Sequence, residues 1–523
     1  MAGKWNHGVE KAALRKFGLN ETYQLAMYLL DQYRGTCLTC RYMIPWHLAP
    51  AESRAQLEEA VKTAVVAAIL RHPMLQVGMG NATSKTPSWI QLQSLDLTHH
   101  IKWEYIGERD NLEQTVQSAF RAQLDDRFHH VSNRQPGWKM TIFRQGSTPT
   151  MEVVLTWNHP QFDGASARII QEDLVDILNA GHGVGTRTGL DGDILTLPER
   201  PPLLPIPIES CQKLPVTLKV LAKAFWEDVR PQFLNRDASW AAWCPIRSSP
   251  YKTQYRAFFV DEASLIAIRT LCRQNKTTIT GLLNALALIA FSWRLDSRTA
   301  PAFQSSTITD HRRNLPPAPP DAPWAQSERA VANYVSQCLH RYETELVARV
   351  RSKLPVESGE ERALSAELQR ELWAVSARNR DEIVAKLKAG LKNDLIGVYK
   401  YVTDWQGTMR GLAKKKRQFT WLVTNLCVLD GNRTTRPGTP PQRDDGQSWS
   451  IDRAQFGLSA EIPPAAIEFA PVGVAGHGMC VSANWPDCAV DEKFGERIVG
   501  DLERWLAQLA GPSTIKKDAD FGG

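Results

Sequence analysis

Residues 151–164 read Met-Glu-Val-Val-Leu-Thr-Trp-Asn-His-Pro-Gln-Phe-Asp-Gly, and this stretch decides the fold. Its first half is apolar and β-branched, as in a buried strand, and ends at polar Asn158 and His159. After Gly164, apolar residues recur at helical spacing, at Ile170, Leu174 and Ile177. Gly181 is placed to end that helix. The sequence therefore predicts a strand, a tight loop and a helix.

The predicted loop holds an imidazole and a carboxylate four residues apart. A neutral histidine can take a proton from a hydroxyl as that hydroxyl attacks a carbonyl, so His159 is a candidate general base. Asp163 lies around a turn, and we expect it to hold the loop by pairing with a distant arginine. The Asp163-Gly164 pair suits a sharp turn whose backbone conformation a side chain would oppose. The alternative is a hydrogen-bonded histidine at a strand end and an ordinary turn.

The pattern His-x-x-x-Asp-Gly, between a strand and a helix, resembles the signature of the CoA-dependent acyltransferase superfamily. This superfamily includes chloramphenicol acetyltransferase, plant BAHD acyltransferases, peptide-synthetase condensation domains, and fungal alcohol and trichothecene acetyltransferases. The resemblance implies an α/β fold of two chloramphenicol-acetyltransferase-like domains with a channel between them. It also implies that His159, as general base, lies in that channel, with Asp163 as its structural partner and Gly164 completing the motif.

Composition is that of a globular protein: 523 residues, 43% of them hydrophobic and 23% charged. No run of eighteen apolar residues predicts a membrane span, and the first residues lack an apolar signal core, so we expect a cytoplasmic protein. The net charge of +6 suits an anionic co-substrate such as CoA but does not argue for nucleic acid. Nine scattered cysteines favour reduced thiols, and no metal site is expected.

A proline-rich stretch between residues 195 and 210 separates two long patterned regions. Such chain is stiff and extended, which favours a linker, although a ligand for a small adaptor domain is an alternative. We therefore predict an N-terminal domain over residues 1–205, a C-terminal domain over 206–511 and a disordered tail over 512–523. Residues 330–410 are highly charged and are predicted to be helical.

A polar strand-like run at residues 305–309 leads to Asp310-His311-Arg312-Arg313. Superfamily members commonly place an arginine after this strand, with prolines close behind, and Pro316 and Pro317 follow here. The resemblance makes Arg312 the first candidate partner of Asp163, with Arg313 the second. The alternative is a pair of ordinary surface arginines.

Residues 419–429 are predicted to form one strand that contains Thr424-Asn425-Leu426-Cys427. This segment resembles the Ser-Asn-x-Gly segment of condensation-like and alcohol acetyltransferase sequences, with cysteine in place of glycine. Either Thr424 or Asn425 could then donate a hydrogen bond to a thioester oxygen, unless both simply face solvent. Phe456-Gly457-Leu458-Ser459 lacks the aspartate and tryptophan of the plant BAHD motif, so that branch is a poor match.

Near the C-terminus, the strand-like residues 479–485 end in Asn484-Trp485 and precede a second helical pattern. This arrangement parallels the strand that ends in Asn158-His159. The resemblance implies two halves of related structure, of which only one carries a histidine. The second copy is expected to be structural.

Together, these features predict an acyl-CoA-dependent O-acyltransferase closest to fungal alcohol acetyltransferases. His159 would activate a hydroxyl of a small secondary-metabolite alcohol, which would attack the thioester, with acetyl-CoA as the expected donor. No serine or cysteine motif argues for an acyl-enzyme. One alternative is a condensation-like or cyclising enzyme without CoA, although Asn158 replaces the first histidine of condensation domains. Another alternative is a non-catalytic docking protein. We expect a monomer with no nucleic-acid partner.

Overall fold

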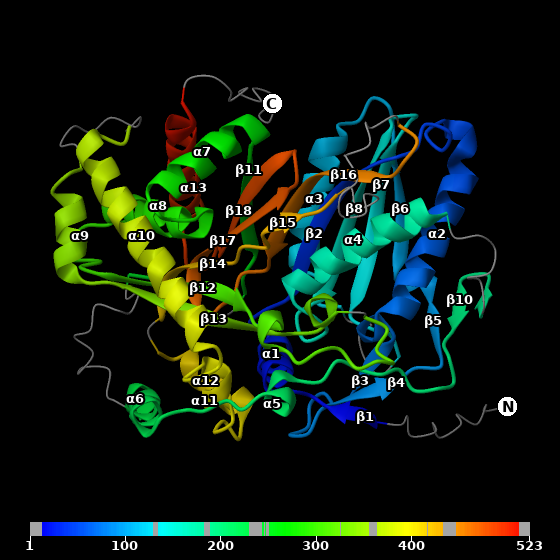
Figure 1. Ribbon diagram of the computed structural model, residues 1–523, viewed down its shortest axis with the longest axis horizontal. Helices are drawn as coiled ribbons and strands as arrows, with labels where there is room; N and C mark the ends of the chain where they lie inside the picture. The colour runs from blue at the N-terminus through cyan, green and yellow to red at the C-terminus, as the bar shows by residue number, and fades with distance from the viewer. Residues whose placement is uncertain are drawn as a thin grey trace.

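The computed structural model describes residues 13–128, 134–181, 189–229, 243–244, 246, 250–324, 326–354, 363–415, 417–431 and 446–511. Two large sheets, each covered by helices, lie side by side (Figure 1). Most of the N-terminal half, blue to cyan, surrounds one sheet, and the C-terminal half, green to red, surrounds the other. The predicted α/β fold class is confirmed.

The first sheet has five strands, in the order β16-β2-β8-β7-β6. All neighbours are antiparallel except the parallel pair β6 and β7. The strands are β2 (Gly35–Met43), β6 (Ile101–Ile106), β7 (Trp138–Gln145), β8 (Thr150–Asn158) and β16 (Ser450–Leu458).

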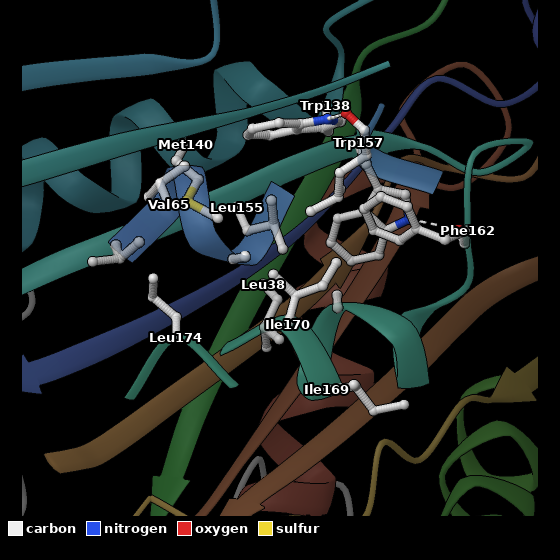
Figure 2. Packing of buried hydrophobic residues seen from close by; sticks show 14 of the residues in the cluster. Leu38, Val65, Trp138, Met140, Leu155, Trp157, Phe162, Ile169, Ile170 and Leu174 are labelled. Carbon is white, nitrogen blue, oxygen red and sulfur yellow. Dashed lines mark hydrogen bonds between the residues drawn. The ribbon is translucent and has the colours of Figure 1, made fainter. Parts of the chain in front are cut away.

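Helices α2 (Arg54–Arg71) and α4 (Gly164–Ala180) cover one face of this sheet. Figure 2 shows Val65 of α2, Leu155 and Trp157 of β8, and Ile170 of α4 in one buried cluster. Val154 instead belongs to a separate cluster with helix α3 (Leu112–Leu124). Successive strand residues point to opposite faces, so β8 carries apolar residues on both faces because both are covered.

The second sheet has seven strands, in the order β11-β18-β17-β14-β12-β13, with β15 beside β17. Its strands are β11 (Thr253–Val260), β12 (Phe303–Asp310), β13 (Val335–Tyr342), β14 (Phe419–Val423), β15 (Val428–Leu429), β17 (Ala465–Val474) and β18 (Gly478–Pro486). Helices that pack on it or on one another are α7 (Glu262–Gln274), α8 (Ile279–Arg294), α10 (Ala366–Ala389) and α13 (Glu492–Ala510).

Helix α8 is apolar on nearly every side because α10, α13 and the strands β12 and β14 surround it. The hydroxyl of Thr278 caps its first turn by accepting from the amide of Gly281, 3.2 Å away. Helix α8 is therefore both capped at its start and buried in the core of this half.

Two three-stranded sheets complete the described strands: β1 (Ala13–Lys16), β4 (Ser88–Gln91) and β3 (Val77–Gly80), then β5 (Ser94–Asp96), β10 (Ile194–Thr196) and β9 (Leu190–Asp191). The other α-helices are α1 (Leu19–Leu29), α5 (Ile208–Cys211), α6 (Leu218–Val229), α9 (Thr344–Arg351), α11 (Leu395–Tyr399) and α12 (Trp405–Leu412).

Two secondary-structure predictions are wrong in part. Strand β13 lies inside the region predicted to be helical. Alternate residues of β13 are buried, but two of these four, Ser336 and His340, are polar, so the hydrophobic period of a strand is weak in the sequence. The strand predicted over residues 419–429 is interrupted after Val423 and resumes only at Val428.

Strand β16 crosses from the C-terminal half of the chain to the first sheet, where it pairs with β2 over its whole length. The prediction assigned these residues to the second domain. The crossing gives β2 a partner for backbone groups that would otherwise form an unpaired sheet edge. The division near residue 205 stays a prediction, and the predicted disordered tail lies outside the described residues.

The expected internal similarity has a structural counterpart. Strand β8 leads through a short loop into α4, and β18 leads through a short loop into α13. Gly181 ends α4 with a φ of 56°, in the left-handed region that favours glycine. In the second copy Asn484 is fully buried on β18, with no histidine beside it.

Candidate active site

His159 lies directly after the last residue of β8 and lines a cavity of about 130 Å³. The cavity wall contains residues from both halves of the chain. This wall includes Gln24, Gly164, Arg168, Thr424, Asn425, Leu426, Cys427, Phe456, Glu461 and Glu468. Since a strand end is a rigid position, β8 fixes the imidazole at the junction of the two halves.

The His159 ring is 8% exposed. Its Nδ1 lies 3.1 Å from Nδ2 of Asn333, which also donates to the carbonyl oxygen of His159 at 3.2 Å. Burial lowers the pKa of His159 to about 4, because the charged imidazolium loses solvation, and the nearby Asp163 carboxylate offsets this shift only in part. The imidazole is therefore neutral at physiological pH. Its Nε2 has no hydrogen-bond partner among the described residues.

Asp163 forms a buried, two-point ion pair with Arg312. Arg312 Nη2 donates to Asp163 Oδ1 at 2.8 Å, and Nη1 donates to Oδ2 at 3.0 Å. The side chains are 0% and 4% exposed, and they come from opposite halves of the chain. The guanidinium charge and the hydrogen bonds hold the pKa of Asp163 below its usual value, against the effect of burial. Arg313, the second candidate, is exposed.

The remaining acceptor positions of Asp163 bind backbone groups of its own loop and of the other half. Oδ1 accepts from the amide and the hydroxyl of Ser166, both at 2.8 Å, which caps the first turn of α4. Oδ2 accepts from the amide of Tyr334 at 2.9 Å. With all these bonds made, Asp163 fixes the loop that carries His159.

Gly164 is required for a different reason from the one predicted. Its φ lies outside the left-handed region, so the turn itself does not demand glycine. A Cβ at this position would instead lie 2.6 Å from Leu426 Cδ2 and 3.1 Å from Phe456 Cζ. The first turn of α4 therefore approaches β16 and the loop after β14 closely, and a side chain at this position would have to displace those of Leu426 and Phe456.

Thr424 and Asn425 both line the cavity, in the loop between β14 and β15. Asn425 uses its amide to hold this loop: Nδ2 donates to Thr280 Oγ1 at 3.0 Å, and Oδ1 accepts from the amide of Cys427 at 2.7 Å. The hydroxyl of Thr424 has no hydrogen-bond partner among the described residues. Of the two candidates, Thr424 is the one that can donate to a ligand.

Cys427 has a φ of 63°, in the left-handed region that a Cβ disfavours by about 1–2 kcal/mol. We expect Cys427→Gly to increase the free energy of unfolding by about 1 kcal/mol, because glycine adopts this conformation without that penalty. Urea unfolding measures the change. Cys427→Ala, which removes the thiol but keeps the Cβ, is the matched control, and an equal gain from alanine would contradict the backbone explanation.

Sequence reasoning missed Asn333, Glu461 and Glu468. Asn333 directly precedes Tyr334, whose amide binds Asp163, so one short segment orients both motif residues. Nothing in the sequence marks this asparagine, because its partner lies 174 residues away. Glu468 and Glu461 lie on and just before β17, where the apolar pattern gives no sign of a cavity.

A larger cavity of about 230 Å³ adjoins the first, because the two share five wall residues. The shared residues are Gln24, Ile308, Val335, Leu422 and Glu461. The rest of its wall is mainly apolar and aromatic, from α1, α11, α12 and β14, and includes Tyr399, Trp405, Met409 and Phe419. The candidate base thus lies near a chamber suited to an apolar molecule.

Within the described ranges, no cluster of three or more histidine, cysteine, aspartate or glutamate side chains could hold a metal ion. Among the same residues, no helix has the length and apolar character needed to cross a bilayer.

The fold and the His159 site define the class: the chain has the fold of CoA-dependent acyltransferases and condensation domains. Its structure is similar to that of the TRI3 trichothecene 15-O-acetyltransferase of Fusarium sporotrichioides, with a TM-score of 0.67, 14% identity and 97% of each chain covered. It is also similar to the condensation domain of the monacolin K polyketide synthase MokA, with a TM-score of 0.55, 11% identity, and 96% of this chain and 98% of that one covered.

Within this class, the family model described as alcohol acetyltransferase matches residues 95–320. A probable alcohol acetyltransferase, FCK4, of Fusarium pseudograminearum (strain CS3096) is 23% identical over 520 residues, which cover 97% of this chain and 98% of the relative. The predicted resemblance to the CoA-dependent acyltransferase superfamily is confirmed, and these similarities support an acyltransferase enzyme.

Proposed function

We propose that the protein transfers an acyl group, acetyl in the first instance, from acyl-CoA to a hydroxyl of a small, largely apolar alcohol. The observation that carries this proposal is the neutral imidazole of His159 in a cavity between the two halves, next to an apolar chamber. The similarity to the alcohol acetyltransferase family and to a trichothecene acetyltransferase supports hydroxyl as the acceptor group.

In the proposed mechanism, Nε2 of His159 accepts the hydroxyl proton while the alcohol oxygen attacks the thioester carbonyl carbon. The carbonyl oxygen gains negative charge, and the Thr424 hydroxyl donates a hydrogen bond to it. When the carbon–sulfur bond breaks, the imidazolium returns the proton to the CoA sulfur. Asp163 and Arg312 take no proton in this cycle, because their role is to hold the His159 loop.

The condensation-like alternative has less support from the geometry. Asn158 occupies the position of the first histidine in condensation domains, and it is fully buried with its amide against Gly137. It is not among the residues that line the His159 cavity. This asparagine therefore offers no second polar group to an acceptor.

Calorimetric titration with acetyl-CoA, followed by mass spectrometry of products from a panel of apolar alcohols, tests the proposal. Saturable binding and ester formation are expected. A well-folded sample that binds neither acetyl-CoA nor a longer acyl-CoA would contradict it. Acetyl-CoA binding with amide formation alone would overturn the hydroxyl acceptor.

The pH dependence of kcat/KM tests the state of His159. Burial places its pKa near 4, below the ordinary value near 6.5, so the imidazole is neutral over most of the acid range. We expect kcat/KM to stay level from about pH 8 to pH 6 and to fall only at lower pH. Samples returned to pH 7.5 before a second assay control for acid unfolding. A reversible loss centred near pH 6.5 would contradict the burial argument.

A further inference from the structure

Two carboxyl groups beside the His159 cavity have no role in the proposed reaction. Glu468, on β17, is 2% exposed and lines this cavity. Glu461, in the loop before β17, lines both this cavity and the larger apolar one. The pair therefore lies at the junction between the candidate base and the apolar chamber.

Neither Glu461 nor Glu468 forms an ion pair within the described residues, although the charge of Arg417 acts on Glu468. Oε2 of Glu468 accepts from Asn484 Nδ2 at 3.1 Å, but Oε1 has no hydrogen-bond partner in the part of the chain that the structure describes. The nearby Arg417 directs its Nη1 to the carbonyl oxygens of Ile462 and Ala465 instead. Burial raises the pKa of Glu461 to about 7, and burial together with repulsion from Glu461 raises that of Glu468 well above its ordinary value. Since buried, unpaired carboxyls destabilise a fold, packing does not explain them.

Gln24 of α1 supplies a second unsatisfied acceptor at the same junction. It lines both cavities, it is 7% exposed, and its Oε1 has no hydrogen-bond partner among the described residues. Two buried oxygens therefore lack donors in a region whose other walls are mainly apolar. A ligand that is apolar but carries hydroxyl groups would satisfy them.

We propose that Glu468, Glu461 and Gln24 form an acceptor subsite that binds a second hydroxyl of an apolar diol or polyol while its first hydroxyl lies at His159. This inference rests on the proposed acyl transfer and adds the acceptor class. A neutral hydroxyl fits better than an ammonium group, because a hydroxyl donates to a carboxyl oxygen without bringing a charge into the apolar chamber.

The test compares binding of decan-1-ol with binding of decanediols that carry the second hydroxyl on carbons 2 to 6, by calorimetry without acetyl-CoA. We expect the best diol to bind about three- to tenfold more tightly than decan-1-ol, which is the contribution of one neutral hydrogen bond. Glu468→Met should abolish this preference, and Gln24→Met should reduce it. Leu422→Met changes the shared wall without removing a polar group, and it should keep the preference.

Three outcomes would overturn the subsite: equal affinity of all diols and decan-1-ol, a preference that survives Glu468→Met, or tighter binding of the matching amino alcohols. If Glu468→Met does not fold, Glu461→Met provides the same comparison from the more open member of the pair. The test distinguishes failure of the proposed subsite from failure of the proposed acyl transfer. A diol preference that Glu468→Met abolishes, in a protein that forms no ester, supports the subsite alone, whereas esters formed equally from decan-1-ol and the diols support the transferase alone.

Discussion

His159→Ala is expected to lower kcat for ester formation by about 10²- to 10⁴-fold, the usual contribution of a general base. The ring is neutral, lines the cavity and has a free Nε2 among the described residues, so the variant removes the proposed proton acceptor. Quantifying the ester by mass spectrometry at saturating acetyl-CoA measures the effect. Alanine leaves a small space at an already open wall, so the fold should persist, as circular dichroism would show.

The matched control for this variant is His100→Gln. His100 is also buried, but it stacks on Trp138 and does not line the cavity. Its replacement should cost stability and spare turnover. Near-normal turnover by His159→Ala would remove the general-base assignment, whereas equal losses in both variants would point to a structural cause.

Asp163→Asn is expected to destabilise the protein by about 3–5 kcal/mol, because it leaves the buried guanidinium of Arg312 without a counter-charge. Activity should fall with stability, since Asp163 also caps α4 and binds the amide of Tyr334. Urea unfolding at pH 7.5 measures the loss. The folded state depresses the pKa of Asp163, so its stabilising effect is present above about pH 4 and declines as the pH falls further.

Asp310→Asn is the matched control, because Asp310 also accepts from Arg312 Nη1 at 3.0 Å but is 41% exposed. Exposed pairs contribute about 0–1 kcal/mol, so this variant should unfold almost as the unmodified protein does. If Asp163→Asn cost no more than Asp310→Asn, the ion pair would not hold the loop. The comparison therefore separates a buried pair from an exposed one at a single arginine.

Residues from both halves of the chain form the site, so the two halves do not contribute to it as independent domains. Strand β16 belongs to the first sheet but is reached from the second, and its Phe456 lies against the position of Gly164. Arg312 and Asn333 reach the His159 loop from the other half. Any change in how the halves pack would therefore displace the candidate base.

The sequence by itself determined the strand, loop and helix around His159, because strand and helix periods are local properties of neighbouring residues. Through a resemblance, it also pointed to Arg312, and the ion pair with Asp163 is present in the structure. The superfamily was recognisable for the same reason, since its signature spans only six residues. The roles of these residues in catalysis stay predictions.

Only the tertiary structure decided what surrounds the motif. It showed that Gly164 makes room for Leu426 and Phe456, that Asn425 holds its own loop, and that β13 is a strand. It also placed the carboxyl groups of Glu461 and Glu468 beside the cavity. These features depend on contacts between residues far apart in the chain. A local pattern cannot encode them, because burial and the identity of a distant neighbour are fixed only when the two halves pack together.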